Sequence, residues 1–347
     1  MKIELDCIIF SLQKGGGISV YFSEIIKRLK LLECDFDILN HNDNFVTKEY
    51  NFSLPKKATI IPLFFFRYMD VYLKADIDIF HSSYYRLPIF WQRKKVRVVT
   101  TVHDFTYEKY SSGIKKYIHH WQKKRAIINS DVIICISKNT KKDLLEYIPE
   151  AGAKKIEIIY NGVSDDYHKL SNEKETITNN IIFVGARSGY KNFEVLVRTL
   201  GQVKDKSLVI IGGGDLTEQE IRLLDENIQY RYEHKSFISN NELNFLYNNS
   251  YCLVYPSLYE GFGIPAIEAM KAGCPVIAAN SSSLPEVCGD AAILLDKINE
   301  ESLKEAIKLL SNKKTRNELI DKGFNNAKRF SWDKMFKELE EIYLGKI

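Results

Sequence analysis

The sequence has no long hydrophobic run. Its 347 residues are 45% hydrophobic and 27% charged, which is ordinary for a soluble globular protein, and no apolar stretch approaches the roughly 18 residues of a membrane-spanning helix. The charged Glu4 and Asp6 argue against an N-terminal secretory signal. We therefore expect a cytoplasmic protein, whose length fits two domains of about 150–170 residues.

Paired cysteines and metal-binding clusters are also lacking. The six cysteines are scattered with no C-x-x-C pair, so we expect core thiols in a reducing compartment rather than disulfides or a metal site. Asp76-Ile77-Asp78 has the spacing of a metal-binding carboxylate pair. It directly precedes the apolar Ile79-Phe80, which favours a polar entry to a strand. We expect neither a metal nor another cofactor.

What is present is an alternation of strand and helix patterns, which predicts an α/β fold with parallel sheets in two Rossmann-like domains. The run 3–11 is strand-like, and a helical pattern follows over 18–32. The polar segment 171–180 is typical of a linker, which divides the chain into 1–170 and 171–330. A last amphipathic helix is expected within 331–347.

The stretch from Leu253 to Leu295 is the most informative. An apolar strand ends at Pro256-Ser257, a glycine turn (EGFGIP) follows, and a helix then begins near Pro265 and ends at Gly273. Such a helix start offers unpaired N–H groups to an anion or to sugar hydroxyls. Two carboxylates flank it, Glu260 in the turn and Glu268 about one turn into the helix. Glu268 lies among Ala, Ile and Met, where a buried charge needs hydrogen-bond donors.

This stretch resembles a known family. Glu260 and Glu268 within EGFGIPAIE, with the preceding P-S and the following A-x-G-x-P-V-I-A, are similar to the paired-glutamate signature of retaining nucleotide-sugar glycosyltransferases of family four. The resemblance implies the GT-B fold, with two Rossmann-like domains facing a central cleft. It also implies sugar transfer from a nucleotide donor with retention of anomeric configuration. Glu268 is then expected to hold the donor ribose, and Glu260 the donor sugar, beside the helix start at Phe262, Gly263 and Ile264.

A second loop carries a cationic pair. Gly185-Ala186-Arg187 and Lys191 lie between a predicted strand and a helix. By themselves they suit a diphosphate about as well as they suit a solvated surface loop. The loop resembles the diphosphate-binding Arg/Lys pair of the mannosyltransferase-like group in bacterial polysaccharide and O-antigen assembly. That resemblance implies a GDP-linked donor such as GDP-mannose, with a UDP-sugar as the alternative, and a glycan or lipid-linked oligosaccharide acceptor.

The first half contributes fewer candidates. His103 follows the β-branched run 97–102 at a strand end, where ligands of open α/β sheets bind, and the resemblance implies contact with the donor sugar. Asp104 is expected to brace this loop. Gly16 and Gly17 correspond to the family's glycine loop near the donor diphosphate and the acceptor, although such a turn is equally typical of a tight connection.

Two other classes remain at this stage. A nicotinamide-dependent dehydrogenase also has glycine turns after strands, but no G-x-G-x-x-G opens a helix with an acidic residue about 20 positions further on. A non-catalytic nucleotide- or sugar-binding module has no need of Arg187 and Lys191 beside a glycine turn.

Positive charge is concentrated in the first half. Residues 1–165 contain 26 Lys and Arg against 19 Asp and Glu, whereas the remainder contains 23 against 26. Basic residues mixed with aromatics suit a peripheral site on an anionic membrane face, and an ordinary solvated basic surface suits the pattern equally well. No nucleic-acid recognition motif accompanies the charge. The residues are Trp91, Arg93, Lys94, Lys95, Arg97, Lys115, Lys116, Tyr117, Trp121, Lys123, Lys124 and Arg125.

Overall fold

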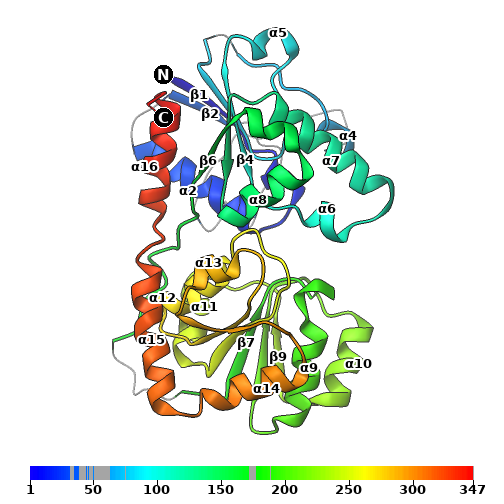
Figure 1. Cartoon of the computed structure of the whole chain (residues 1–347), viewed down its shortest axis with the longest axis vertical. Helices are drawn as coiled ribbons and strands as arrows, with labels where there is room; N and C mark the ends of the chain where they lie inside the picture. The colour runs from blue at the N-terminus through cyan, green and yellow to red at the C-terminus, as the bar shows by residue number, and fades with distance from the viewer. Residues whose placement is uncertain are drawn as a thin grey trace. The chain divides into compact units, whose positions relative to one another are not determined.

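The chain divides into two compact units in a computed structural model that describes residues 1–31, 35–38, 44, 46, 50, 63–74, 76–171, 177–187 and 189–346 (Figure 1). The first unit contains Met1–Asn161 together with Trp332–Ile347, and the second contains Gly162–Ser331. Each unit is built around one parallel sheet. The predicted pair of Rossmann-like domains is therefore confirmed.

The sheet of the first unit has the strand order β2-β1-β3-β4-β5-β6. The strands β3 (Ile79–Ser82) and β5 (Val132–Cys135) are buried along their whole length, as expected for parallel strands covered by helices on both faces. The other strands are β1 (Lys2–Asp6), β2 (Asp35–Ile38), β4 (Arg97–Val102) and β6 (Lys155–Ile158). The helices described in this unit are α1 (Ile9–Leu12), α2 (Gly17–Leu31), α4 (Leu63–Phe66), α5 (Phe90–Arg93), α6 (Thr106–Tyr110), α7 (Gly113–Ile128), α8 (Lys138–Tyr147) and α16 (Trp332–Tyr343).

The first strand is shorter than the sequence predicts. It ends at Asp6, and the apolar residues that follow form the short helix α1. A short buried helix and a buried strand have the same apolar composition, so periodicity could not separate them. The early turn leaves Asp6 at the carboxyl end of β1.

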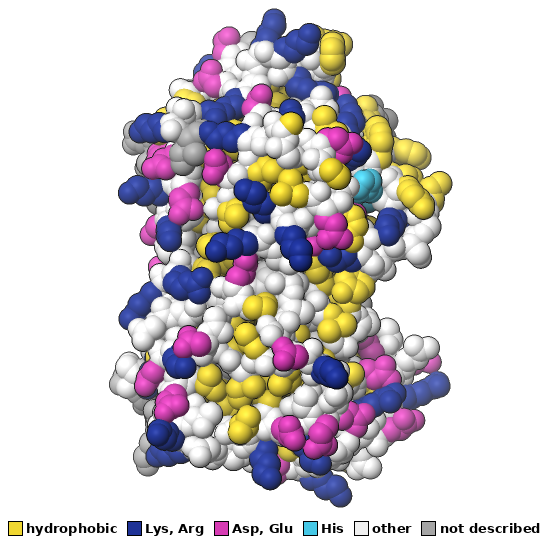
Figure 2. Space-filling view, viewed as in Figure 1, with side chains coloured by type: hydrophobic (Ala, Val, Ile, Leu, Met, Phe, Trp, Pro, Cys, Tyr) yellow, Lys and Arg dark blue, Asp and Glu magenta, His cyan; other side chains and the backbone are white. Residues whose placement is uncertain are grey.

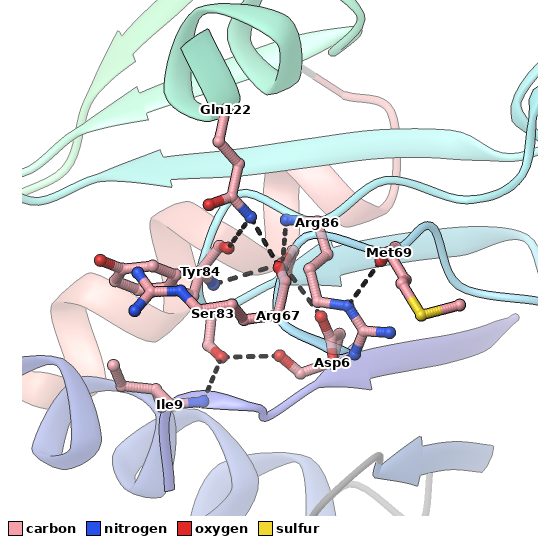
Figure 3. Close-up of polar contacts among 9 residues, drawn as sticks. Asp6, Ile9, Arg67, Met69, Ser83, Tyr84, Arg86 and Gln122 are labelled. Atoms are coloured by element: carbon pink, nitrogen blue, oxygen red, sulfur yellow. Dashed lines mark hydrogen bonds and ion pairs between the residues drawn. The ribbon is translucent and has the colours of Figure 1, made fainter. Parts of the chain in front are cut away.

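A buried polar network surrounds Asp6. Arg86 Nη1 lies 3.0 Å from Asp6 Oδ1, and both side chains are almost fully buried. Figure 3 shows how Ser83 joins the same network: its hydroxyl donates to the Asp6 carbonyl and accepts from the amide of Ile9. Arg86 also donates to the carbonyl of Met69. A charge pair buried this deeply is tolerated because its remaining hydrogen-bonding groups are satisfied, and it connects the ends of β1 and β3.

The sheet of the second unit has the order β12-β11-β10-β7-β8-β9. Apolar residues of its strands pack with those of α9 (Phe193–Gln202) and α14 (Glu300–Leu309) in one core. The strands are β7 (Asn180–Val184), β8 (Ser207–Ile211), β9 (Tyr232–Lys235), β10 (Cys252–Tyr255), β11 (Val276–Ala279) and β12 (Ala292–Leu295). The remaining helices are α10 (Glu218–Asn227), α11 (Asn240–Asn249), α12 (Ile264–Lys271), α13 (Leu284–Cys288) and α15 (Lys313–Ala327).

The chain enters the second unit before the polar segment that the sequence pointed to. The amides of His168 and Leu170 donate to Asn244 and Asn248 of α11, which attaches the residues after Asn161 to the second unit. The last helix, α16, belongs to the first unit, where Tyr343 OH lies 2.7 Å from His81 Nδ1. These side-chain contacts, which composition does not reveal, determine where the division falls.

Two expectations from composition can be checked on the described residues. Every cysteine among them is free and buried, as core thiols should be. No helix in the described part of the chain is long and apolar enough to cross a membrane.

Candidate active site

The second unit gathers three loops at one edge of its sheet. Strands β10, β7 and β8 are parallel neighbours, so their carboxyl ends open on the same edge, where ligands of open α/β sheets bind. The loops that follow them span 256–263, 185–192 and 212–217. They contain all the predicted site residues of this unit except Ile264 and Glu268, which lie on α12.

Arg187 is embedded in the glycine turn after β8 and is not a solvated surface cation. Its side chain is only 3% exposed, and its Nε donates to Glu220 Oε1 at 2.7 Å. Its Nη1 donates to the carbonyl of Gly212 at 2.8 Å, and its Nη2 to that of Asp215 at 2.8 Å. The guanidinium is therefore held in one orientation by a carboxylate and a ring of carbonyls.

Glu220 is a site residue that sequence reasoning missed. It is the third residue of α10 and closes a capping box with Thr217, whose hydroxyl accepts from the Glu220 amide. Burial acts to raise the pKa of Glu220, but hydrogen bonds from Arg187 and Thr217 outweigh it and leave the pKa below its usual value. The carboxylate is thus charged at neutral pH and pairs with Arg187. The S/T-x-x-E pattern predicts the helix start but not the partner.

The turn has room for Arg187 because residue 213 is glycine. Gly213 has a φ of +76°, and a Cβ added there would lie 2.4 Å from Arg187 Nη1 and 2.8 Å from the carbonyl oxygen of Gly185. Gly185 itself has a φ of +114°. Both positions are in a region that L-residues with side chains avoid, so these glycines allow two loops and one guanidinium to pack closely.

Lys191 and Glu260 are in direct contact. Lys191 Nζ lies 2.5 Å from Glu260 Oε1, and the two side chains are 11% and 12% exposed. Lys191 comes from a short 3-10 turn, Gly189–Lys191, before α9, and Glu260 comes from the loop after β10. The sequence singled out these residues separately, and the fold places them together at the sheet edge.

The turn before α12 is fixed by two serines. The hydroxyl of Ser283 donates to the carbonyls of Glu260 and Phe262 at 2.9 and 2.8 Å, and the hydroxyl of Ser282 accepts from the Glu260 amide at 2.9 Å. Gly263 caps the helix with a φ of +107°. Ile264 begins α12, and its start at a glycine cap with proline next matches the predicted turn.

Glu268 lies in α12 and is partly exposed rather than buried as its apolar neighbours suggested. Tyr247 OH lies 3.5 Å from Glu268 Oε2. Burial, and secondarily the charge of Glu268, raise the pKa of Tyr247 well above its usual value, so the phenol stays protonated and can donate. Glu268 as a residue is thus partly accessible, as a ligand-binding residue must be.

In the first unit, His103 directly follows β4. It is buried, with its ring edge-to-face against Tyr21 at 5.1 Å between centroids, and its Nε2 has no hydrogen-bond partner among the described residues. Burial lowers the pKa of His103 to about 4, so the imidazole is neutral at pH 7. A neutral ring with an unsatisfied nitrogen can exchange a hydrogen bond with a hydroxyl.

The His103 turn is braced from beneath by a buried lysine. Lys123 Nζ donates to the Asp104 carbonyl at 2.9 Å and to Glu108 Oε2 at 2.8 Å. Asp104 in turn accepts from the Thr106 amide, the bracing role expected for it. Although burial opposes it, the neighbouring His119 and the charge of Lys123 lower the pKa of Glu108 to about 2.

Comparison with known proteins identifies the family. Residues 15–167 match the family described as "Glycosyltransferase Family 4", and residues 164–326 match "Glycosyl transferases group 1". An uncharacterised glycosyltransferase of Methanocaldococcus jannaschii is 30% identical over 94% of both chains. The chain belongs to the family-four glycosyltransferases. An O-antigen chain mannosyltransferase of Salmonella typhimurium is 31% identical over 68% of this chain and 66% of its own.

The same comparison confirms the GT-B fold class of this glycosyltransferase. The sucrose-phosphate synthase of Thermosynechococcus elongatus superposes with a TM-score of 0.79 over 99% of this chain and 98% of its own, at 19% identity. Membership of the family implies a nucleotide-sugar donor and a glycan acceptor.

Two further features of this glycosyltransferase can now be placed. Gly16 and Gly17 are exposed at the N-terminus of α2. Asp76 and Asp78 precede β3, and Asp78 accepts a hydrogen bond from the Lys2 amide at 2.8 Å. The aspartates therefore lie at the amino edge of the sheet, opposite the edge where ligands bind.

The predicted basic face needs a correction. Lys123 is fully buried and ion-paired, so it is not part of any surface. Lys124 pairs with Glu150 at 2.6 Å, and Arg125 with Asp70 at 2.5 Å. Consecutive cations in a sequence are typical of a solvated face. Here the helical period turns Lys123 inward, and acidic residues from other elements pair with Lys124 and Arg125.

Proposed function

We propose that this glycosyltransferase moves a hexose from a nucleotide-sugar to a hydroxyl of a glycan or lipid-linked oligosaccharide, with retention at the anomeric carbon, in the assembly of a surface polysaccharide. The observation that carries the proposal is the convergence of Arg187, Lys191 and Glu260 at the carboxyl edge of the second sheet. The names of the mannosyltransferase relatives support the polymer class.

The two cations suit the leaving group. Negative charge grows on the departing nucleoside diphosphate as the glycosidic bond breaks, and fixed cations stabilise that charge without reorganising. Arg187 supplies a fixed positive charge, already oriented by Glu220 and by the carbonyls of the glycine turn, and Lys191 adds a point charge. We infer that these side chains do the work that a divalent metal does in other transferases, so that transfer is metal-independent.

The carboxylates and the helix start suit the sugar part of the donor. Glu260 and the amides of Phe262, Gly263 and Ile264 lie at the N-terminus of α12, where N–H groups lack helical partners. Glu268, further along α12, is partly exposed, and its carboxylate is of the kind that accepts from ribose hydroxyls. In the first unit, the unpartnered Nε2 of His103 is suited to a sugar hydroxyl, and Gly16 and Gly17 to the diphosphate or the acceptor.

A cation-replacement series tests the central assignment. Arg187→Ala and Lys191→Ala should each lower the single-turnover transfer rate by about 10²–10³-fold. Matched controls are Arg198→Ala, an exposed arginine of α9, and Lys204→Ala, an exposed lysine of the same unit. Rates of the Arg187 and Lys191 variants that match those of the controls would remove both residues from the site. The anomeric configuration of the product, read by NMR, tests retention.

For the donor we propose GDP-mannose or a close GDP-sugar, on the strength of the mannosyltransferase relatives. The base is expected near Phe237 and Ile238, which follow β9 at the same sheet edge. A pocket built for one base leaves polar groups unpaired against another, at a cost of about 1–3 kcal/mol for each. Competition between GDP and UDP for the purified protein tests this choice. Tighter binding of UDP would favour a UDP-sugar donor and leave the transferase assignment intact.

A further inference from the structure

Helix α7 carries an apolar stripe that faces outward. Ile114, Tyr117, Ile118 and Trp121 are 75%, 73%, 38% and 56% exposed. Their spacing of three and four places them on one face of the helix. Side chains of this size and composition normally face a core, so their exposure together calls for a partner.

The stripe is not the side by which α7 is attached to its domain. The opposite side of the helix is buried, including Gln122, Lys123 and Ala126. Gln122 donates to the carbonyl of Arg67 (Figure 3) and Lys123 to that of Asp104. The helix is therefore held firmly through its inner face, and the outer stripe is available without any rearrangement.

Helix α6 packs against α7 and extends the apolar surface with the exposed Tyr107 and Tyr110. In the same unit, Phe90 and Trp91 of α5 are exposed as well. Figure 2 shows hydrophobic side chains gathered at the upper right of that view, in the region of α6 and α7. The aromatic residues are mostly Tyr and Trp, which combine an apolar ring with a polar group and favour the boundary between water and lipid.

The charges that α5 and α7 themselves carry have one sign, and the acidic partners Asp70 and Glu150, which come from elsewhere, pair with Arg93, Lys124 and Arg125 and not with Lys94, Lys95 or Lys115. The segments 90–97 and 113–128 contain no Asp or Glu, and Lys94, Lys95 and Lys115 are exposed beside their aromatic neighbours. A second copy of the chain docking face to face would bring like charges together, whereas anionic lipid headgroups attract each Lys. The surface therefore complements a negatively charged bilayer.

We propose that α6 and the outer stripe of α7 dock this glycosyltransferase on the surface of a bilayer that contains anionic lipid. The stripe rests in the headgroup region, and Lys115 and Lys116 contact the phosphates. Lys123, on the inner face of the same helix, holds the turn that presents His103. Helix α7 thus joins the lipid-facing surface to a loop of the candidate site within one unit. If the acceptor is lipid-linked, as the proposed function has it, docking brings the acceptor and this loop together.

Vesicle sedimentation tests the proposal with the full chain. Phosphatidylcholine vesicles with phosphatidylglycerol should bind the protein, pure phosphatidylcholine vesicles should bind it much more weakly, and added salt should release it. Lys115→Glu with Lys116→Glu should lower binding to the anionic vesicles by more than about thirtyfold, because each change removes a positive charge and adds a negative one. Tyr117→Gln with Trp121→Gln should lower it by about tenfold.

Matched controls are Lys308→Glu and Tyr230→Gln, exposed residues of the second unit, which should bind as the parent does. Unchanged thermal melting and unchanged GDP or UDP binding show that the variants are folded, independently of transfer activity. Binding that ignores lipid charge and salt, or α7 variants that bind like the controls, would overturn the proposal. If the parent protein forms a dimer that these substitutions disrupt, and does not bind vesicles, the stripe contacts a second copy of the chain instead of a bilayer.

Discussion

The close packing of Arg187 against the glycine turn leads to a test at a residue with no side chain of its own. In Gly213→Ala, the added methyl group would lie 2.4 Å from Arg187 Nη1 and 2.8 Å from the Gly185 carbonyl. Carbon atoms do not approach so closely, so the guanidinium and the 185 loop must move. The neighbouring Gly214 has almost the same backbone, with a φ of +73°, but open space where its Cβ would be.

The two substitutions therefore share one cost and differ in another. Placing an L-residue at these φ values costs about 1–2 kcal/mol in either variant. Only Gly213→Ala also places a side-chain atom against Arg187 and so displaces it from its carbonyl partners, the oxygens of residues 212–215. A cation displaced by about 1 Å loses much of its effect on the transition state, a change of roughly 10²-fold in rate.

The assay is single-turnover sugar transfer at saturating donor, which separates the chemical step from donor affinity. We expect Gly214→Ala to retain most of the parent rate and Gly213→Ala to fall about 10²-fold below it. Thermal melting of both variants accounts for the shared backbone strain. Equal rates for the two alanine variants would show that the position of the Arg187 guanidinium on this turn does not affect transfer, and would refute the reasoning.

Three further predictions follow from the same structure. Transfer should persist in excess EDTA, because Asp76 and Asp78 lie at the amino edge of their sheet; activity lost to EDTA and restored by Mn²⁺ would contradict this. Glu268→Gln should raise the donor dissociation constant about tenfold or more with little change in single-turnover rate at saturation, whereas a loss of rate alone would contradict the ribose assignment. Burial lowers the pKa of His81 to about 3 and that of His103 to about 4, whereas the pKa of an unfolded histidine is near 6.5. Between these values the unfolded chain binds more protons than the folded one, so the free energy of unfolding falls as the pH falls. Urea unfolding should give a free energy of unfolding at pH 5 that is lower than at pH 7 by roughly 2 kcal/mol per histidine. His81→Gln should reduce that difference. The same pH dependence of stability in His81→Gln and the parent would contradict the prediction.

Much of the fold was predictable because its signals are local. The alternation of apolar strands, glycine turns and amphipathic helices predicts parallel sheets, because the spacing of hydrophobic residues within each element indicates which of its faces is buried. The turn around Glu260 was predictable for the same reason: glycine, proline and the helix start are consecutive in the chain. The apolar run after Asp6 was misjudged, because a short buried helix and a short buried strand have the same composition.

The partners in the candidate site could not be predicted in this way. Arg187 and Glu220 are separated by 33 positions, and Lys191 and Glu260 by 69, so no local pattern reports that they meet. Ser282, which accepts from the Glu260 amide, belongs to a stretch of serines that reads as an ordinary loop. Sheet order decides these contacts, because it determines which loops end side by side.

The two faces of α7 show most clearly what the sequence determines and what only the tertiary structure determines. The sequence alone determined the family signature, the two Rossmann-like halves and the aromatic and basic character of residues 113–128. Only the tertiary structure decided that Lys123 is buried against Glu108 while Tyr117 and Trp121 face outward. The reason is physical: the burial of a charge depends on whether a distant carboxylate is there to meet it, and that is a property of packing rather than of the local chain.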